Sequence, residues 1–174
     1  WEMLVGRHTK SSAGSVFREQ PLEDVSGNLE EGAGEKMDLQ DAVVIITGSG
    51  TGIGRATALL FAERGARVVV CGRRPEPLTE TVRLIEQRGG NALAVLTDVR
   101  DWGQVIGMVN TVSEHFGKVD ILINNAGVAI AKPVVETTEE EWDKMLDTNL
   151  KGIFLCCKAV LPSMVEACNG MIVN

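Results

Sequence analysis

A run of glycine and hydroxyl-bearing residues, T-G-S-G-T-G-I-G at positions 47–54, has the composition of a phosphate-binding turn. Glycine accepts the backbone angles of a sharp turn and leaves no side chain between the backbone and an anion. An apolar stretch, 42–46, precedes the run, and a helix through 55–61 would offer an anion its free N–H groups and its dipole. The run therefore predicts a cradle for the phosphates of a dinucleotide. A tight turn with a glycine packing contact is the alternative.

The spacing of the glycines separates this run from two common phosphate-binding motifs. It reads T-G-x-x-x-G-x-G, because Ile53 and Arg55 stand where G-x-G-x-x-G would need glycine. The Lys-Ser/Thr pair of a P-loop is absent from it as well. Its place between an expected strand and an expected helix favours dinucleotide binding over a purely structural turn.

Short apolar runs alternate with longer helical stretches along the rest of the chain. We expect strands at 42–47, 67–71, 92–97, 119–123 and 171–174, and helices at 52–64, 75–88, 101–116 and 138–159. Asp101 with Gln104 and Thr138 with Glu141 have the spacing of capping boxes. Strands that alternate with helices imply right-handed crossovers and a parallel sheet covered on both faces. The predicted fold class is α/β: a doubly wound, Rossmann-type, three-layer domain, incomplete at its C-terminus.

The first 36 residues differ from the remainder. They contain five glycines and many charges, and their apolar residues follow no sustained period. We interpret 1–36 as a disordered or non-native leader, with Met37 as a candidate natural start, and 37–174 as the nucleotide-binding domain.

Composition excludes several classes of function. The net charge of −7 argues against a partner with a phosphate backbone, whether nucleic acid or anionic membrane. No apolar run approaches the about 20 residues of a membrane span, and the N-terminus does not resemble a secretory signal, so we expect a cytoplasmic protein. The four cysteines show no C-x-x-C spacing and only two histidines accompany them, so we expect no metal site and read the cysteines as buried small side chains.

Three further segments complete a pattern with the glycine run. Asp98 and Val99 follow the third expected strand, N-N-A-G at 124–127 follows the fourth, and Asn149 lies in the last expected helix. With these motifs, residues 37–174 resemble the short-chain dehydrogenase/reductase family of NAD- or NADP-dependent oxidoreductases. The resemblance implies a cofactor-binding set of Gly48, Ser49, Gly52, Ile53, Gly54, Asp98, Val99, Asn125, Ala126 and Gly127.

The resemblance also assigns roles within this set. The glycine run would contact pyrophosphate through backbone amides, Asp98 and Val99 would contact adenine, and Asn149 would help to hold a water of the proton relay. Each polar side chain has a structural alternative. Asp98 could cap the turn into Asp101, Asn125 could cap a strand end, and Asn149 could kink its helix by bonding to backbone.

The residues after the second expected strand bear on the choice of cofactor. A free ribose 2′-hydroxyl is usually met by a carboxylate about 20 residues beyond the glycines, whereas a 2′-phosphate needs a cation. Gly72, Arg73 and Arg74 occupy this place, with no acidic residue among them. An arginine fork suits a phosphate, so we expect NADP(H), bound through Arg73, rather than NAD(H). The alternative is that both arginines only solvate a loop, and the neutral Thr51 offers no second cation before Gly52.

The family's catalytic Tyr-x-x-x-Lys has no counterpart, because the sequence contains no tyrosine. The resemblance places the family's catalytic serine a few residues beyond Asn174, where this sequence ends. One hypothesis is therefore the N-terminal part of a reductase that interconverts a small-molecule carbonyl and an alcohol, with this fragment inactive alone. The other is an inactive nucleotide-binding or interaction module. The resemblance implies a homodimer or homotetramer for the full-length protein, and leaves oxoacyl thioesters, sugars, polyols and other ketones open as substrates.

Overall fold

The computed structural model describes residues 39–174, which contain five strands and five α-helices. The predicted leader, 1–36, lies outside the described residues. The strands are β1 (Val43–Thr47), β2 (Arg67–Gly72), β3 (Asn91–Leu96), β4 (Ile121–Ile123) and β5 (Met171–Val173). The helices are α1 (Gly52–Glu63), α2 (Pro75–Glu86), α3 (Trp102–Phe116), α4 (Glu139–Leu146) and α5 (Gly152–Glu166).

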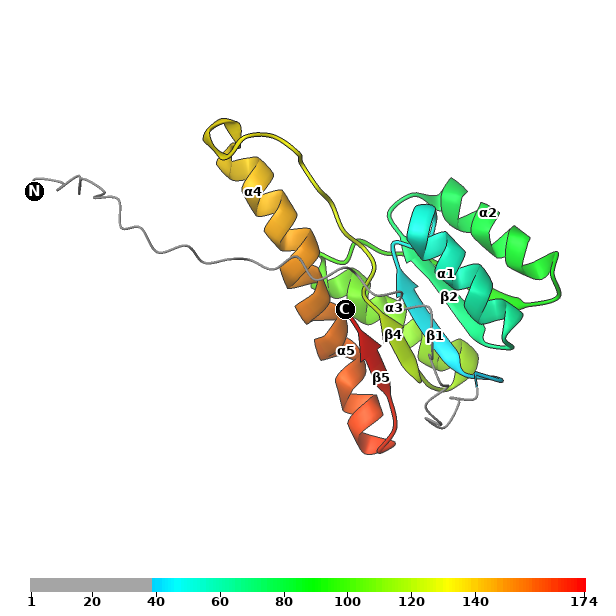
Figure 1. Cartoon of the computed structure of the whole chain (residues 1–174). Coiled ribbons are helices and arrows are strands. Elements are labelled where there is room, and N and C mark those ends of the chain that lie inside the picture. The colour runs from blue at the N-terminus through cyan, green and yellow to red at the C-terminus, as the bar shows by residue number, and fades with distance from the viewer. Residues whose placement is uncertain (1–38) are drawn as a thin grey trace, which may run out of the picture. The chain divides into compact units, whose positions relative to one another are not determined.

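All strands run parallel in the order β3-β2-β1-β4-β5 (Figure 1). The predicted doubly wound α/β sheet is thereby confirmed. The winding reverses at β1, which pairs with β2 on one side and with β4 on the other. In such sheets the crevice for a ligand opens at the carboxyl ends of the strands where the order reverses.

The central strand β1 has both of its faces buried, and its alternate residues belong to two separate cores. Val43 and Ile45 pack in a core with residues of α3 and α5, whereas Val44 and Ile46 pack with residues of α1 and α2. A strand that is covered on both faces consists of a continuous apolar run, as parallel sheets require. The three layers of the prediction are thus helices, sheet and helices (Figure 1).

Most helix ends lie where the sequence predicts them, with one difference in the capping of α3. Thr138 and Glu141 form a complete capping box at the start of α4. The Asp101 side chain accepts from the Gln104 amide, as predicted, but Gln104 Oε1 accepts from the amide of Asp98 at 2.9 Å. The predicted box fails because the Asp101 amide already donates to the carbonyl of Asp98.

The predicted helix 138–159 is interrupted in the structure. A π-helical segment, Asp147–Lys151, joins α4 to α5, and α5 continues to Glu166. Such wide turns are rare and often occur at functional sites, and this one contains Asn149. The fourth strand also begins later than predicted, at Ile121. The amide of Val43 donates to the carboxylate of Asp120 at 2.8 Å instead of to a backbone carbonyl, so the register pairing of β1 with β4 starts only at Val44 and Ile121.

The cysteines divide between core and surface. Cys71 and Cys156 are buried as predicted, and burial raises the pKa of both thiols, so they pack as neutral groups. Cys168 is exposed, which corrects the expectation for that residue, because it lies in the turn after α5 with φ of 48°. Among the described residues no helix combines the length and the hydropathy needed to cross a bilayer.

Two glycines of α3 should respond oppositely to the same substitution. Gly107 lies inside the helix, and Gly117 ends it with φ of 82°; an added Cβ at either position would meet nothing within 4 Å. Gly107→Ala should raise the free energy of unfolding by about 1 kcal/mol, because alanine favours the helix. Gly117→Ala should lower it by about 1 kcal/mol, because an L-residue is strained at positive φ. Urea unfolding measures both, and shifts of equal sign would contradict the assigned backbone.

Candidate functional site

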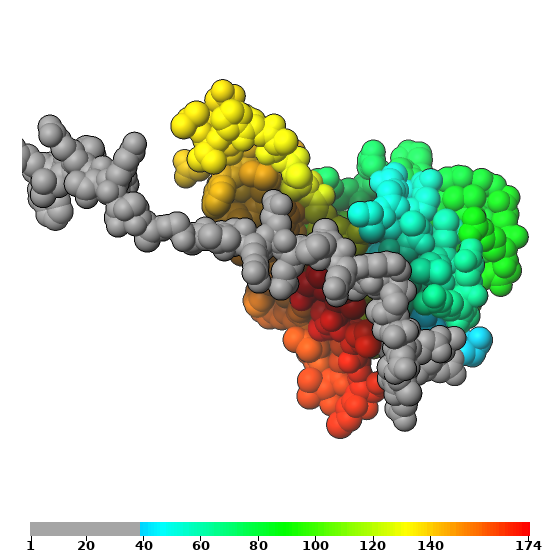
Figure 2. Space-filling model, viewed as in Figure 1, coloured from blue at the N-terminus to red at the C-terminus, as the bar shows by residue number. Residues whose placement is uncertain are grey.

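A cavity of about 350 Å³ opens at the carboxyl ends of β1, β2, β3 and β4. In the space-filling view a hollow separates the yellow surface of the residues after β4 from the cyan surface of α1 (Figure 2). Nine of the predicted site residues line the cavity: Gly48, Ile53, Gly54, Arg73, Asp98, Val99, Asn125, Ala126 and Gly127. Ser49, Gly52 and Asn149 do not line it. Residues outside the predicted set also contribute: Gly50, Thr51, Gly72, Arg74, Leu78, Thr97, Val128 and Thr148.

The glycine turn packs directly on the N-N-A-G segment that follows β4. Gly48 has φ of 67°, and a Cβ there would lie 2.9 Å from the Cα of Ala126. A Cβ on Gly54 would lie 2.5 Å from Nδ2 of Asn125 and 2.6 Å from the carbonyl oxygen of Gly48. Both positions therefore require glycine for packing. The glycine packing contact, given above as the alternative to phosphate binding, is therefore present. The same glycines also line the cavity, so the two interpretations are compatible.

Backbone amides along the turn differ sharply in their hydrogen bonding. The Ser49 amide donates to the carbonyl of Cys71 at 3.2 Å, and the fully buried Ser49 hydroxyl donates to Ile46 and accepts from Cys71. Ser49 thus ties the turn to β1 and β2, and its predicted contact with pyrophosphate stays a prediction. In contrast, the amides of residues 50–54 donate to no acceptor within 39–174. These five donors, three of them in the first turn of α1, are the groups that an anion would satisfy.

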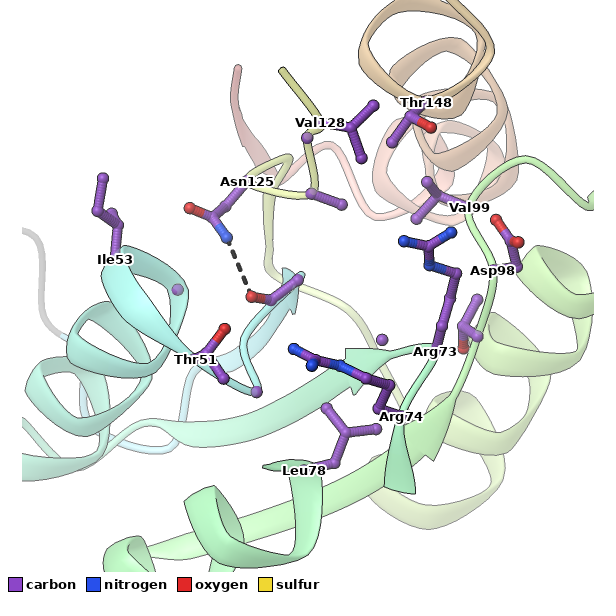
Figure 3. A pocket seen from close by; sticks show the side chains of 17 residues that line it. Thr51, Ile53, Arg73, Arg74, Leu78, Asp98, Val99, Asn125, Val128 and Thr148 are labelled. Carbon is purple, nitrogen blue, oxygen red and sulfur yellow. Dashed lines mark hydrogen bonds between the residues drawn. The ribbon is translucent and has the colours of Figure 1, made fainter. Parts of the chain in front are cut away.

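Thr47, the first residue of the glycine motif, joins the ends of β1 and β4. Its hydroxyl oxygen accepts from the amides of Asn125 and Ala126, both at 2.9 Å. The Asn125 side chain donates to the carbonyl of Thr47 at 2.8 Å and to that of Gly48 at 3.3 Å, and Figure 3 marks the bond to Gly48. The structural alternative for Asn125, the capping of strand ends, is confirmed. Thr47 was not among the predicted site residues, although it is the first residue of the T-G-x-x-x-G-x-G run, which could have indicated it.

Asp98 lies at the cavity wall with its carboxylate held by Arg100. The guanidinium donates from Nε to Oδ1 at 3.0 Å and from Nη2 to Oδ2 at 2.6 Å, and the Arg100 amide donates to Oδ1 at 3.1 Å. These bonds hold the pKa of Asp98 below its ordinary value, so the carboxylate is ionised at neutral pH. Asp98 therefore caps its own turn, while its contact with adenine stays a prediction.

Val99 forms the contact between the cavity wall and α5. It is buried, and a Cβ added to Gly152 would lie 2.7 Å from its Cγ2. Gly152 therefore allows the first turn of α5 to approach the segment after β3. Gly152 does not itself line the cavity, and only this close approach shows that it supports Val99, since nothing in the local sequence predicts it.

Asn149 fixes the loop after β4 to the π-helical segment. Its Oδ1 accepts from the amide of Val128 and its Nδ2 donates to the carbonyl of the same residue, both at 2.8 Å. The side chain thus bonds to backbone, as the structural alternative states, but to the backbone of another element rather than of its own helix. Next to it, the buried Thr148 lines the cavity. The role of Asn149 in a proton relay stays a prediction.

Arg73 and Arg74 place two cations at the cavity. Figure 3 shows the Arg74 side chain directed toward Thr51 and the Arg73 side chain directed toward Val99 and Asp98. Both arginines are exposed, and neither forms a hydrogen bond or an ion pair within residues 39–174. Both are therefore free to meet an anionic ligand. Within the same part of the chain, no group of three or more His, Cys, Asp or Glu side chains could hold a metal ion.

The ion pair of Asp98 should make stability depend on pH in the acid range. Because its pKa is lower in the folded chain, Asp98 contributes stability above its ordinary pKa of about 3.9 and loses it as the pH falls through the lower folded value. Asp98→Asn should cost about 1 kcal/mol at pH 7. Urea unfolding of both proteins should show this difference shrinking from about pH 5 to about pH 2. Asp143→Asn, an exposed position on α4, is the control, and a difference that stays constant for Asp98→Asn would contradict the ion pair.

Comparison with protein families agrees with the fold and the motifs. The family described as short chain dehydrogenase matches residues 42–174. The (2S)-((R)-hydroxy(phenyl)methyl)succinyl-CoA dehydrogenase subunit BbsD of Thauera aromatica is 43% identical over 138 residues, which are 79% of this chain and 56% of that protein. The 3-oxoacyl-(acyl-carrier-protein) reductase FabG of Thermotoga maritima is 38% identical, with the same coverage of 79% and 56%.

A solved structure shows the same relationship. The crystal structure of a putative short-chain alcohol dehydrogenase from Sinorhizobium meliloti 1021 superimposes with a TM-score of 0.75 at 41% identity, over 79% of this chain and 54% of that one. The chain thus spans a little over half the length of the relatives it matches. The family match, the identities and the shared fold agree: the chain belongs to the short-chain dehydrogenase/reductase family.

Proposed function

We propose that residues 42–174 form the cofactor-binding part of an NADP(H)-dependent oxidoreductase that interconverts a carbonyl and an alcohol. One observation carries the proposal: five successive unpaired amides, 50–54, adjoin a cavity that two unpaired arginines also line. The family implies an NAD(P) cofactor. The donors and cations of this site fit a ligand with a pyrophosphate and a further phosphate.

The residues present divide the work of binding. The free amides of the turn would bind the pyrophosphate, aided by the positive end of the α1 dipole. Asp98 and Val99 would bind the adenine, and the exposed side chain of Ile53 lines the cavity beside the turn. A bound nicotinamide dinucleotide supplies the hydride. Asn149 would act by fixing the loop at Val128, which borders the cavity.

The preference for NADP(H) rests on charge at the end of β2. No carboxylate is available at Gly72 to accept from a ribose 2′-hydroxyl, and both following side chains are cationic. Arg73 also acts electrostatically on the carboxylate of Asp98, which already forms an ion pair with Arg100. Arg74, directed into the cavity, is a second candidate for the 2′-phosphate beside Arg73 (Figure 3).

The cofactor preference can be measured by titration. The chain should bind NADPH more tightly than NADH, and Arg73→Gln or Arg74→Gln should weaken NADPH binding about tenfold or more, because a charge-assisted hydrogen bond is lost. NADH affinity should stay unchanged in both variants. Isothermal titration calorimetry with each nucleotide provides the measurement.

Arg83→Gln is the matched control for these variants. Arg83 lies on α2 and pairs with Glu80 outside the cavity, so its loss changes net charge by the same amount. Its NADPH affinity should equal that of the wild type. Equal binding of NADH and NADPH by the wild type, unchanged in both cavity variants, would refute the preference.

The chemistry beyond binding concerns the whole protein. The sequence contains no tyrosine, so the tyrosine that donates the proton in this family is not among these 174 residues. We propose a carbonyl or alcohol substrate for the full-length enzyme. By their names, BbsD and FabG act on acyl groups carried as thioesters, which supports an acyl thioester among the candidates.

Oligomer formation belongs to the same proposal. Large apolar side chains are exposed on α4, α5 and the segment between them: Trp142, Leu146, Leu150, Phe154, Leu161 and Val165. Leu150 and Phe154 are 65% and 59% exposed. An apolar surface of this kind supports pairing with a second copy, as a homodimer or homotetramer of the full-length protein.

Turnover distinguishes the reductase proposal from an inactive nucleotide-binding module. The purified chain should bind NADPH but should not oxidise it when acetoacetyl-CoA or other carbonyl compounds are added, because no tyrosine is present to supply the proton. Absorbance at the NADPH band follows the reaction. Carbonyl-dependent oxidation above the uncatalysed rate would overturn this expectation and assign the acid to another residue of this chain.

A further inference from the structure

Arg55, on the first turns of α1, reaches across to α2 without entering the cavity. Its Nη2 donates to the carbonyl of Gly50 at 2.5 Å, and its Nε donates to Oγ1 of Thr81 at 3.0 Å. It forms no ion pair with a carboxylate in the described part of the chain. The half-buried Arg55 guanidinium thus bonds only to neutral acceptors, which belong to the glycine turn and to α2.

Thr81 completes this contact from the side of α2. Its side chain is fully buried, and its hydroxyl lies 3.2 Å from the carbonyl oxygen of Ser49, 3.4 Å from that of Gly50 and 2.9 Å from that of Pro77. The turn also packs on α2 without a side chain between them, since a Cβ on Gly50 would lie 3.0 Å from Cβ of Pro77. The Arg55 guanidinium therefore binds the carbonyl of Gly50. The Thr81 hydroxyl accepts from Arg55 and has one proton, which the carbonyls of Ser49, Gly50 and Pro77 share as acceptors. The Arg55 side chain and the Thr81 hydroxyl, called the brace below, thus hold two consecutive carbonyls of the turn on the side of α2.

The direction of these carbonyls decides where the next amides point. In a trans peptide the C=O of one residue and the N–H of the next point in opposite directions. With the carbonyls of Ser49 and Gly50 held toward α2, the amides of Gly50 and Thr51 point away from it. These are two of the five unpaired donors. The brace thus fixes the orientation of donors that it does not itself touch.

We propose that Arg55 and Thr81 are positioning residues, which hold the turn ready for pyrophosphate before any ligand binds. The inference rests on the proposed function, because it concerns the affinity of the same cofactor site. Neither side chain lines the cavity, so neither contacts the ligand. Their effect is preorganisation: ordering the turn in advance removes that cost from binding. Helix α2, on which Thr81 lies, begins directly after Arg74. The brace therefore also fixes the glycine turn relative to Arg73 and Arg74.

Two substitutions at Thr81 separate the hydroxyl from the rest of the side chain. Thr81→Val keeps the shape and loses the hydrogen bonds, and Thr81→Ser keeps the hydroxyl. Thr81→Val should weaken binding of NADP+ about tenfold, since the turn carbonyls lose a buried partner, while Thr81→Ser should bind within about twofold of the wild type. Binding of adenosine 2′-monophosphate, which has no pyrophosphate, should change less than about twofold in either variant.

Thr79→Val is the matched control, because Thr79 is exposed on the same helix and its hydroxyl donates only to the carbonyl of Pro75. Its binding of both nucleotides should equal that of the wild type. Circular dichroism melts establish the temperature at which every variant is folded. If Thr81→Val does not fold, Arg55→Gln, at a half-buried position, takes its place with the same expectation.

A second measurement needs no ligand. The 15N order parameters of the Gly50 and Thr51 amides should be about 0.85 in the wild type and should fall toward about 0.6 in Thr81→Val, with Thr79→Val unchanged. Unchanged order parameters, or equal losses for NADP+ and adenosine 2′-monophosphate, would overturn the inference. A wild-type chain that binds neither NADP+ nor NAD+ overturns the proposed function instead, and the order parameters then decide whether the brace orders the turn.

Discussion

The join between the carboxyl ends of β1 and β4 is the constraint on which the site depends. Both strands end where the winding of the sheet reverses, and Gly48 and Asn125, which follow them, line the cavity. Thr47 and Asn125 satisfy one another's backbone at this point. The glycine turn can then pack on Ala126 with no side chain between. Without these bonds, the backbone groups at the two strand ends would need water or a ligand as hydrogen-bond partners, and such a partner would lie between the strands.

Around this join some polar groups have hydrogen-bond partners within the domain and others have none. The Ser49 amide bonds to β2, the turn carbonyls bond to the brace, and the Asp98 carboxylate bonds to Arg100. Within residues 39–174, the amides 50–54 and the two arginines that follow β2 remain unpaired at the cavity. A site with these donors and cations favours an anion, because the Gly50 carbonyl and the Asp98 carboxylate, which would repel it, already have partners.

Prediction from the sequence succeeded for the strands and for most helix ends, and it was wrong where a contact from another element intervenes. Gly65 and Gly117 end their helices at positive φ, as local residue types indicate. The interruption at Asp147–Lys151 was not predicted, because the segment contains no Gly or Pro to mark a break in the helix. The late start of β4 depends on Asp120 bonding to Val43, 77 residues away. Local signals cannot report a bond across that separation.

The sequence by itself determined the parallel α/β class and the position of the phosphate-binding turn, because both follow from short-range features: apolar runs, glycine spacing and helix caps. Only the tertiary structure decided which groups of the turn are free. Ser49 lies in the motif, yet its amide is paired, while Arg55 and Thr81, 26 residues apart, hold a turn they were not predicted to touch. Hydrogen-bonding partners are set by which elements pack together, and that packing is a property of the whole domain.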